Sequence, residues 1–170
     1  MSDGPDTAEF AEFATSRHGA LYRYAYLLAG DRGLAEDLVQ EALVKTYVAW
    51  RRMRDPNNAE AYTRRVITTT AISWWRRKSW HERPHDNIPD RPVYGDDATA
   101  RIWLWNELSG LPARQRAAVV LRYYEDLTEA QTAEVLGCSV GTVKSQVSEA
   151  LKKLRARLGT DIVEMAGLTE

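Results

Sequence analysis

Residues 128–158 read TEAQTAEVLGCSVGTVKSQVSEALKKLRARL, and this stretch carries the start and stop signals of two consecutive helices. Thr128 and Gln131 have the spacing of a capping box, in which two side chains satisfy backbone N–H groups at a helix start. Gly137 tolerates the left-handed backbone with which many helices end, and Ser139 is a suitable cap for the next helix. The stretch therefore predicts a helix-turn-helix.

The second of these helices is expected to have an apolar face and a polar face. The expected buried stripe follows helical spacing and consists of Val140, Val143, Val147, Ala150, Leu151 and Leu154. The small residues Ala133 and Gly137 allow the two helices to cross closely. The polar and basic side chains left on the outer face are Thr142, Lys144, Ser145, Ser148, Glu149 and Lys152.

These outer-face residues are candidate DNA contacts, because the N-terminal half of the second helix of a helix-turn-helix enters the major groove. Thr142 or Lys152 is suited to a phosphate contact. The residues suited to base edges are Lys144, Ser145, Ser148 and Glu149. A glutamate in that position would accept a hydrogen bond from a cytosine amino group. The alternative is a helical hairpin that serves only for packing.

Three further helices are predicted upstream. Apolar spacing from Phe10 to Leu28 indicates a helix that Gly30 ends. The next helix runs from about 33 to 53, and its apolar stripe is Leu34, Leu38, Ala42, Thr46, Trp50 and Met53. The third begins at an Asn cap, Asn57 or Asn58, is supported by Glu60 and reaches about Lys78. Its β-branched run at 66–70 favours a strand when taken alone, but the flanks are helical and no partner strand is visible.

Residues 79–97 have the composition of a flexible linker, with Pro84, Pro89, Pro92 and Gly95 among scattered acidic residues. Helical spacing resumes at Ala98, and Pro112 opens another helix, which is expected to bury Ala113, Ala117, Val120, Leu121 and Tyr124. The predicted fold is all-α. It has two small helical domains at 7–78 and 98–158, joined by the linker at 79–97, and a C-terminal tail at 159–170.

The net charge of −1 hides an uneven distribution along the chain. Residues 1–41 hold eight acidic residues against three arginines, a net charge of −5. Residues 51–78 have a net charge of +6, and residues 142–157 have a net charge of +4. Two separated basic patches fit two contacts on one nucleic acid, since binding responds to the local potential. Solvated helix faces are the alternative reading.

Several other classes of protein are disfavoured. No secretory signal and no apolar run of 18 residues is present, which indicates a soluble cytoplasmic protein without a membrane segment. Cys138 is the single cysteine, which argues against a disulfide or a cysteine-based zinc site. Residues 81–85 read HERPH and match a zinc-protease motif, but Pro84 lies inside the helical turn that the motif requires. We expect no enzyme activity, no metal, no cofactor and no small-molecule substrate.

Motifs in both halves of the chain resemble the extracytoplasmic-function sigma factors of the sigma-70 family, particularly the sigma-E-like branch of actinobacteria. The first half carries AEDLVQEA at 35–42, AYTRRV at 61–66 and SWWRR at 73–77, similar to sigma regions 2.2, 2.3 and 2.4. The second half carries LPARQR at 111–116, YYEDLT at 123–128 and GTVKSQVS at 141–148, similar to sigma region 4. The similarity runs from about residue 10 to residue 157, with both domains in the family's order.

The resemblance implies that the chain confers promoter recognition and transcription initiation on core RNA polymerase at a stress- or signal-responsive promoter class. Region 4 would bind the −35 element. Region 2 would open and read the −10 element through Tyr62, Arg64, Arg65, Trp74, Trp75, Arg76 and Arg77. Region 2.2 would bind polymerase through Asp37, Leu38, Gln40 and Glu41. The implied partners are promoter DNA and the β′ coiled coil and β flap of polymerase, and an anti-sigma factor is a further candidate.

The sequence also fits two alternative functions, and it departs from the family pattern at one position. The helix-turn-helix also suits an operator-binding regulator that acts without polymerase, although that reading leaves the first 78 residues unexplained. A protein-binding helical adaptor predicts no salt-sensitive DNA affinity. Many relatives have Arg where this chain has Glu149, so a cationic contact cannot be transferred to that position.

Overall fold

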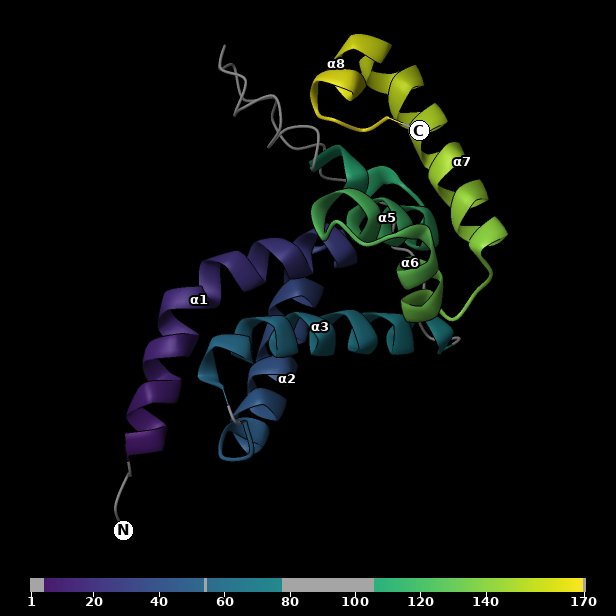
Figure 1. Cartoon of the computed structure of the whole chain (residues 1–170). Helices are drawn as coiled ribbons and strands as arrows, with labels where there is room; N and C mark the ends of the chain where they lie inside the picture. The colour runs from purple at the N-terminus through teal and green to yellow at the C-terminus, as the bar shows by residue number, and fades with distance from the viewer. Residues whose placement is uncertain (1–4, 54, 78–105, 170) are drawn as a thin grey trace, which may run out of the picture. The chain divides into compact units, whose positions relative to one another are not determined.

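The computed structural model describes residues 5–53, 55–77 and 106–169 (Figure 1). The chain divides into two compact units, Met1–Lys78 (unit 1) and Ser79–Glu170 (unit 2). Within the described ranges all regular structure is helical, which confirms the predicted all-α fold. The linker assigned to 79–97, the HERPH motif and the helix start at Ala98 lie outside the described residues.

Unit 1 contains α1 (Pro5–Ala29), α2 (Arg32–Trp50), the 3-10 turn η1 (Pro56–Asn58) and α3 (Ala59–Arg76). Gly30 takes a φ of 68° and ends α1, as its sequence position predicts. α2 begins only two residues later, at Arg32, because the Asp31 carboxylate caps it by accepting a hydrogen bond of 2.9 Å from the Leu34 N–H. Each pair of these helices is in contact, and the fully buried residues between them include Leu21, Tyr24, Leu28, Leu38, Val39 and Ile67.

In the β-branched run of α3, the Thr68 and Thr69 hydroxyl groups find partners within the unit, whereas the buried Thr70 hydroxyl has none among the described residues. Thr68 Oγ1 donates to the Arg64 carbonyl at 2.9 Å, one turn back along the helix. The same hydroxyl lies 2.6 Å from the Tyr24 hydroxyl of α1. Thr46 of α2 and Thr63 of α3 are joined at 2.8 Å in the same way. These buried bonds connect three helices and satisfy polar groups that would otherwise be costly to bury.

Two predictions about helix ends in unit 1 are corrected. The second helix ends at Trp50, and the predicted end, Met53, follows it half-buried. Asn58 is the N-cap residue of α3, as predicted, but the predicted capping bond is wrong, because the Asn58 side chain makes none. In the turn before α3, the Asp55 carboxylate accepts from the Asn57 N–H at 2.9 Å.

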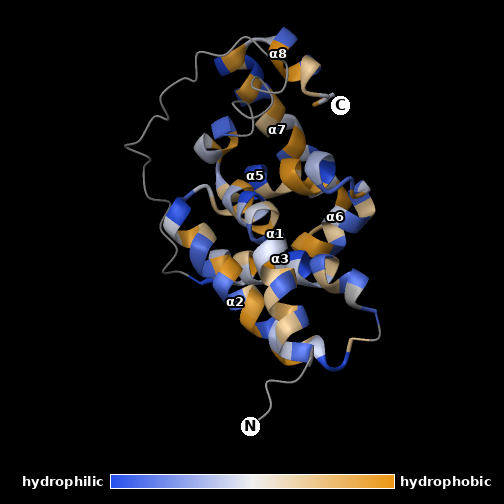
Figure 2. Ribbon diagram, turned by 90° about the vertical axis from the view of Figure 1, so that its left-hand side faces the viewer, coloured by the Kyte–Doolittle hydropathy of each residue, from blue (hydrophilic) through white to orange (hydrophobic). Residues whose placement is uncertain are grey.

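Unit 2 contains a 3-10 turn followed by a run of short helices and one long helix. The described elements are η2 (Leu108–Gly110), α5 (Ala113–Val119), the π-helical turn η3 (Val120–Tyr124), α6 (Glu129–Leu136), α7 (Val140–Leu158) and α8 (Thr160–Met165). Pro112 directly precedes α5, where its missing N–H has no helical partner to lose. Four of the five residues predicted to be buried here are buried, and Tyr124 is half-buried. Figure 2 shows how polar and apolar residues alternate around the helices.

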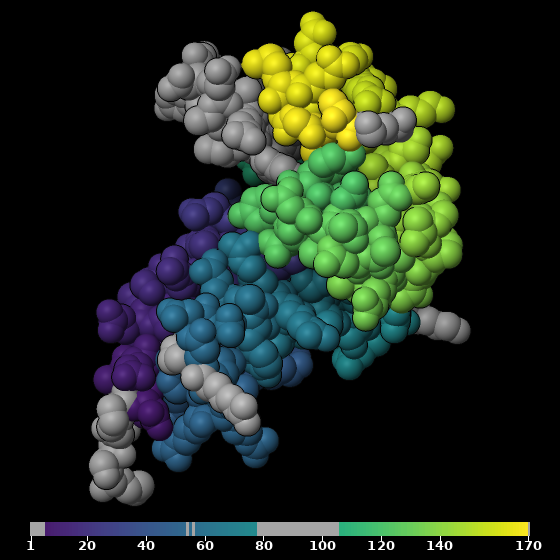
Figure 3. Space-filling model, in the orientation of Figure 1, coloured from purple at the N-terminus to yellow at the C-terminus, as the bar shows by residue number. Residues whose placement is uncertain are grey.

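The assignment of residues 159–170 as a tail is corrected by the structure. Gly159, with a φ of 90°, turns the chain back, and α8 packs against α7. Val163 and Leu168 are fully buried, and the Tyr123 hydroxyl donates to the Thr169 carbonyl at 2.6 Å. Figure 3 shows this segment, in yellow, as part of the body of unit 2. The segment is therefore built into the unit.

Candidate nucleic-acid interface

The predicted helix-turn-helix forms from α6 and α7 with the predicted caps. Thr128 Oγ1 accepts from the Gln131 N–H at 3.1 Å, and Gln131 Oε1 accepts from the Thr128 N–H at 2.9 Å. Gly137 ends α6 with a φ of 66°, and the Ser139 hydroxyl accepts from the Thr142 N–H at 3.1 Å. Each cap satisfies a backbone group that the helix leaves unpaired. The caps fix the turn from which α7 projects.

The apolar stripe of α7 is buried with one exception. Val143, Val147, Ala150, Leu151 and Leu154 are buried. Val140 is 39% exposed, which corrects its assignment to the buried stripe. It is the first residue of α7 and lies one turn before the residues that pack on α5 and α6.

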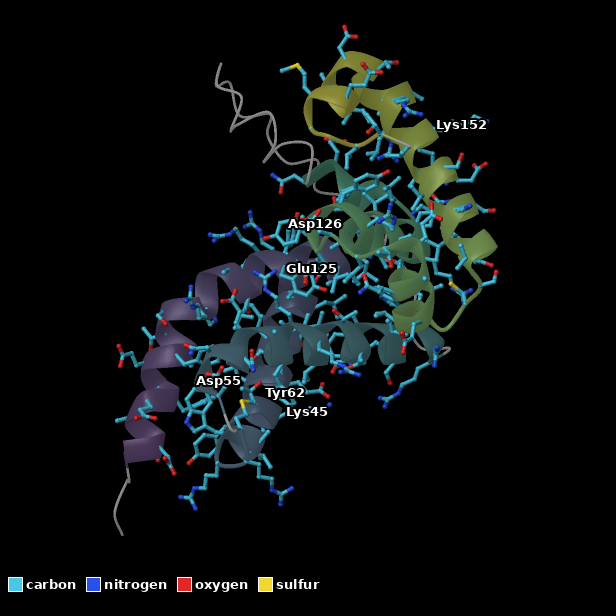
Figure 4. All side chains as sticks on the ribbon, viewed as in Figure 1. Lys45, Asp55, Tyr62, Glu125, Asp126 and Lys152 are labelled. Carbon is cyan, nitrogen blue, oxygen red and sulfur yellow. The ribbon has the colours of Figure 1, made fainter. Side chains whose placement is uncertain are left out.

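Five of the six predicted contact residues of α7 are exposed, namely Lys144, Ser145, Ser148, Glu149 and Lys152. Figure 4 shows Lys152 projecting from the outer side of the helix. Thr142 is half-buried, and its hydroxyl lies 2.9 Å from the Ser139 hydroxyl. Thr142 therefore belongs to the helix cap, and the exposed polar face begins at Lys144.

A hollow of about 270 Å³ adjoins this face. Its lining comes from three elements and consists of Arg122, Tyr123, Glu129, Val143, Lys144, Val147 and Ser148. The Arg122 guanidinium lies 5.8 Å from the centre of the Tyr123 ring and donates to the Leu127 carbonyl. Sequence reasoning missed Arg122, because no local pattern shows that η3 lies beside α7. A further cation, Arg122, therefore lines the same hollow as Lys144.

The second basic face lies on α3 in unit 1. Tyr62, Arg65, Arg76 and Arg77 are exposed, and Trp74 and Trp75 are half-buried. Thr69 and Ser73 are exposed in the same stripe and were missed, although their spacing of seven and eleven residues from Tyr62 is helical. The result is a face of cations, hydroxyl groups and an aromatic ring along one helix.

Arg64 differs from its neighbour Arg65, although both were predicted contacts. The Arg64 guanidinium lies 5.3 Å from the centre of the Tyr24 ring and pairs with Glu60 at 3.1 Å. Glu60 also pairs with Arg17 of α1 at 3.4 Å. Arg64 is thus engaged inside unit 1, whereas the Arg65 side chain faces solvent.

The predicted polymerase-facing residues lie on α2. Asp37 and Gln40 are exposed, and Glu41 pairs with Lys45 at 3.0 Å. Leu38 is fully buried, so its assignment as a contact residue is corrected: it supports the helix from the core. Val44 and Val48 are 63% and 69% exposed and extend the same stripe, although the sequence analysis did not single them out.

Within residues 5–53, 55–77 and 106–169, no group of three or more His, Cys, Asp and Glu side chains is arranged to hold a metal ion. In the same ranges, no helix has both the length and the hydropathy required to cross a bilayer.

The two units and their exposed faces define a class: all-helical proteins that combine a helix-turn-helix with a second, separate basic helical face. Two family descriptions match the chain, "Sigma-70 region 2" over residues 13–81 and "Sigma-70, region 4" over residues 101–154. The chain belongs to the sigma-70 family of RNA polymerase sigma factors, in its extracytoplasmic-function group. The resemblance drawn from the sequence motifs is confirmed.

Similar proteins cover nearly the whole chain. The RNA polymerase sigma-E factor of Streptomyces coelicolor is 41% identical over 157 residues, which span 90% of this chain and 88% of that protein. The sigma factor SigV of Bacillus subtilis is 28% identical over 138 residues, or 81% of this chain and 83% of that protein. Among solved structures, the sigma factor RpoE in complex with the anti-sigma factor NepR from Bartonella quintana is similar with a TM-score of 0.61. That similarity has 25% identity and covers 90% of this chain and 98% of that chain.

Proposed function

We propose that this sigma factor directs core RNA polymerase to a specialised, signal-responsive class of promoters through two DNA contacts, one from each unit. The observation that carries the proposal is the presence of an exposed basic helix face on each compact unit of a chain whose net charge is only −1. Two moderate contacts on one DNA molecule reinforce each other, because the second becomes intramolecular once the first has formed. The role is non-catalytic and cytoplasmic and needs no cofactor.

Unit 2 reads the −35 element through the outer face of α7. The N-terminal half of α7 is the part that enters a major groove. The exposed residues in this half, or directly after it, meet base edges, and they are Lys144, Ser145, Ser148 and Glu149. Lys152 lies further along and contacts phosphate. Thr142 contributes by holding the start of the helix in place.

Unit 1 holds the −10 element through α3. Arg65, Arg76 and Arg77 supply phosphate contacts along an exposed stripe, with Tyr62 at one end of it. Trp74 and Trp75 are half-buried, so each has a packed part and an accessible part for stacking on an unpaired base. Arg64 supports this face from inside the unit.

Polymerase binds to the exposed stripe of α2. Asp37, Gln40 and Glu41 give it an acidic and polar end, and Val44 and Val48 add apolar area. The β′ coiled coil is the proposed partner of this stripe, and the β flap that of unit 2. An anti-sigma factor is proposed as a competing partner, by analogy with the complex of the Bartonella protein.

The test is binding of the full chain to core RNA polymerase, followed by transcription from mapped promoters. We expect the double substitution Asp37→Ala with Gln40→Ala to weaken polymerase binding about tenfold or more, the scale of removing interface anchor residues. Glu12→Ala, which removes an exposed carboxylate from α1, is the matched control and should leave binding unchanged. Unaltered binding by the double variant would contradict the role of α2. DNA binding without any polymerase dependence would favour an operator-binding regulator.

A further inference from the structure

We infer that Glu129 is a positioning residue that restrains Lys144 and thereby limits the affinity of unit 2 for DNA. Glu129 begins α6, and Lys144 lies in the second turn of α7. The Lys144 ammonium nitrogen is 3.6 Å from Glu129 Oε2, and the two side chains are 63% and 40% exposed. The inference rests on the proposed function, in which Lys144 meets the −35 DNA.

The backbone around Glu129 is fixed by the helix cap. The side chains of Thr128 and Gln131 each accept a hydrogen bond from the other residue's backbone N–H, so the capping box is complete without Glu129. Its carboxylate is therefore not needed for the cap, and it pairs with Lys144. On the other side of the pair, the buried residues Val143 and Val147 hold α7 in register.

The pair lies at the edge of the proposed DNA-reading face. Glu129, Lys144 and Ser148 line the same hollow, to which Arg122 adds a second cation. A carboxylate in this place has two effects that oppose DNA, and the first is expected to dominate because Glu129 and Lys144 form an ion pair. The carboxylate holds an ammonium that a phosphate or a base acceptor would otherwise take, and it repels the approaching phosphates.

The two effects can be separated by their dependence on Lys144. If the carboxylate acts by holding the ammonium, neutralising it strengthens DNA binding only while Lys144 is present. If the carboxylate acts by its own charge, the gain persists without Lys144. A double-mutant cycle measures this difference directly. The pair is exposed and screened by solvent, so the expected gain is modest.

The experiment measures the affinity of the full chain for a random-sequence 30-base-pair duplex, at several salt concentrations. We expect Glu129→Gln to tighten binding about twofold to fivefold. We also expect the slope of log K against log salt to be steeper by about one, because on a duplex without the −35 sequence the released Lys144 pairs with phosphate in place of a base edge. In a Lys144→Ala background the same change should have an effect of less than about 1.5-fold. Glu134→Gln, an exposed neutralisation on the same helix, is the control and should change neither quantity.

Equal tightening by Glu129→Gln with and without Lys144 would overturn the inference, as would no tightening at all. A gain in affinity with an unchanged salt slope would also contradict it, because no new phosphate contact would then form. Failure of the proposed function looks different. In that case no substitution on the outer face of α7, Lys152→Ala included, alters binding of the duplex.

Discussion

The outer faces of α3 in unit 1 and α7 in unit 2 are both basic, but they are built differently. On α7 the buried stripe is regular, so the polar residues at the intervening positions face solvent together. On α3 two consecutive arginines separate: Arg64 lies over Tyr24, and Arg65 is exposed. Membership of a basic motif therefore does not by itself make a residue a DNA contact. The partners of the side chain inside the unit determine whether it is exposed.

The largest expected effects test whether each face is held by its own core. Ile67 of α3 and Leu154 of α7 are fully buried, and Ile67→Ala or Leu154→Ala should destabilise its own unit by about 2–5 kcal/mol. Hydrogen exchange followed by mass spectrometry would locate the loss of protection. We expect faster exchange in α1–α3 for the first change and in α5–α8 for the second. Equal loss in both units for either change would break the comparison.

The pair of arginines on α3 is expected to show an intermediate effect. Arg64→Ala should lower the free energy of unfolding by about 1–2 kcal/mol, since it removes a cation–π contact and a partly buried ion pair. Arg65→Ala should change stability by less than about 0.5 kcal/mol. Arg65→Ala should nevertheless weaken binding of single-stranded −10 DNA and reduce the salt slope by about one. Urea denaturation and DNA titration of both variants check this, and similar stability losses would contradict it.

The smallest effect concerns the C-terminal segment, which has no counterpart in unit 1. Tyr123→Phe removes the hydrogen bond to the Thr169 carbonyl and should cost about 0.5–1 kcal/mol. Hydrogen exchange should rise in 160–169 and stay unchanged in α6. A variant with unchanged exchange in the segment would show that Val163 and Leu168 alone hold it.

The features that could be predicted from the sequence depend on residues within four positions of each other. The capping box at Thr128, the left-handed Gly137 and the Ser139 cap are local, and all three are present as predicted. The sequence also predicted that α3 is helical throughout its β-branched run, because the residues on both sides of the run keep helical spacing. These local signals were enough to define the helix-turn-helix and its polar face.

The remaining features depend on tertiary partners that no short pattern specifies. Asp55 accepts a hydrogen bond from the Asn57 N–H in the turn before α3, whereas Asn58 precedes α3 without a side-chain capping bond. Leu38 was assigned to a contact surface from its motif, although its side chain lies in the core. The burial of Val163 and the nearness of Arg122 to α7 depend on chain segments that meet only after folding.

The central claim is that two separate helical faces read two separate promoter elements, and Glu149 offers the most direct test. Glu149 is exposed on α7, where an acceptor suits cytosine and an arginine suits guanine. The measurement is genome-wide mapping of start sites transcribed by reconstituted holoenzyme carrying the wild-type chain or Glu149→Arg. We predict a changed −35 preference with an unchanged −10 preference. An identical set of promoters, or a change at both elements together, would contradict the account.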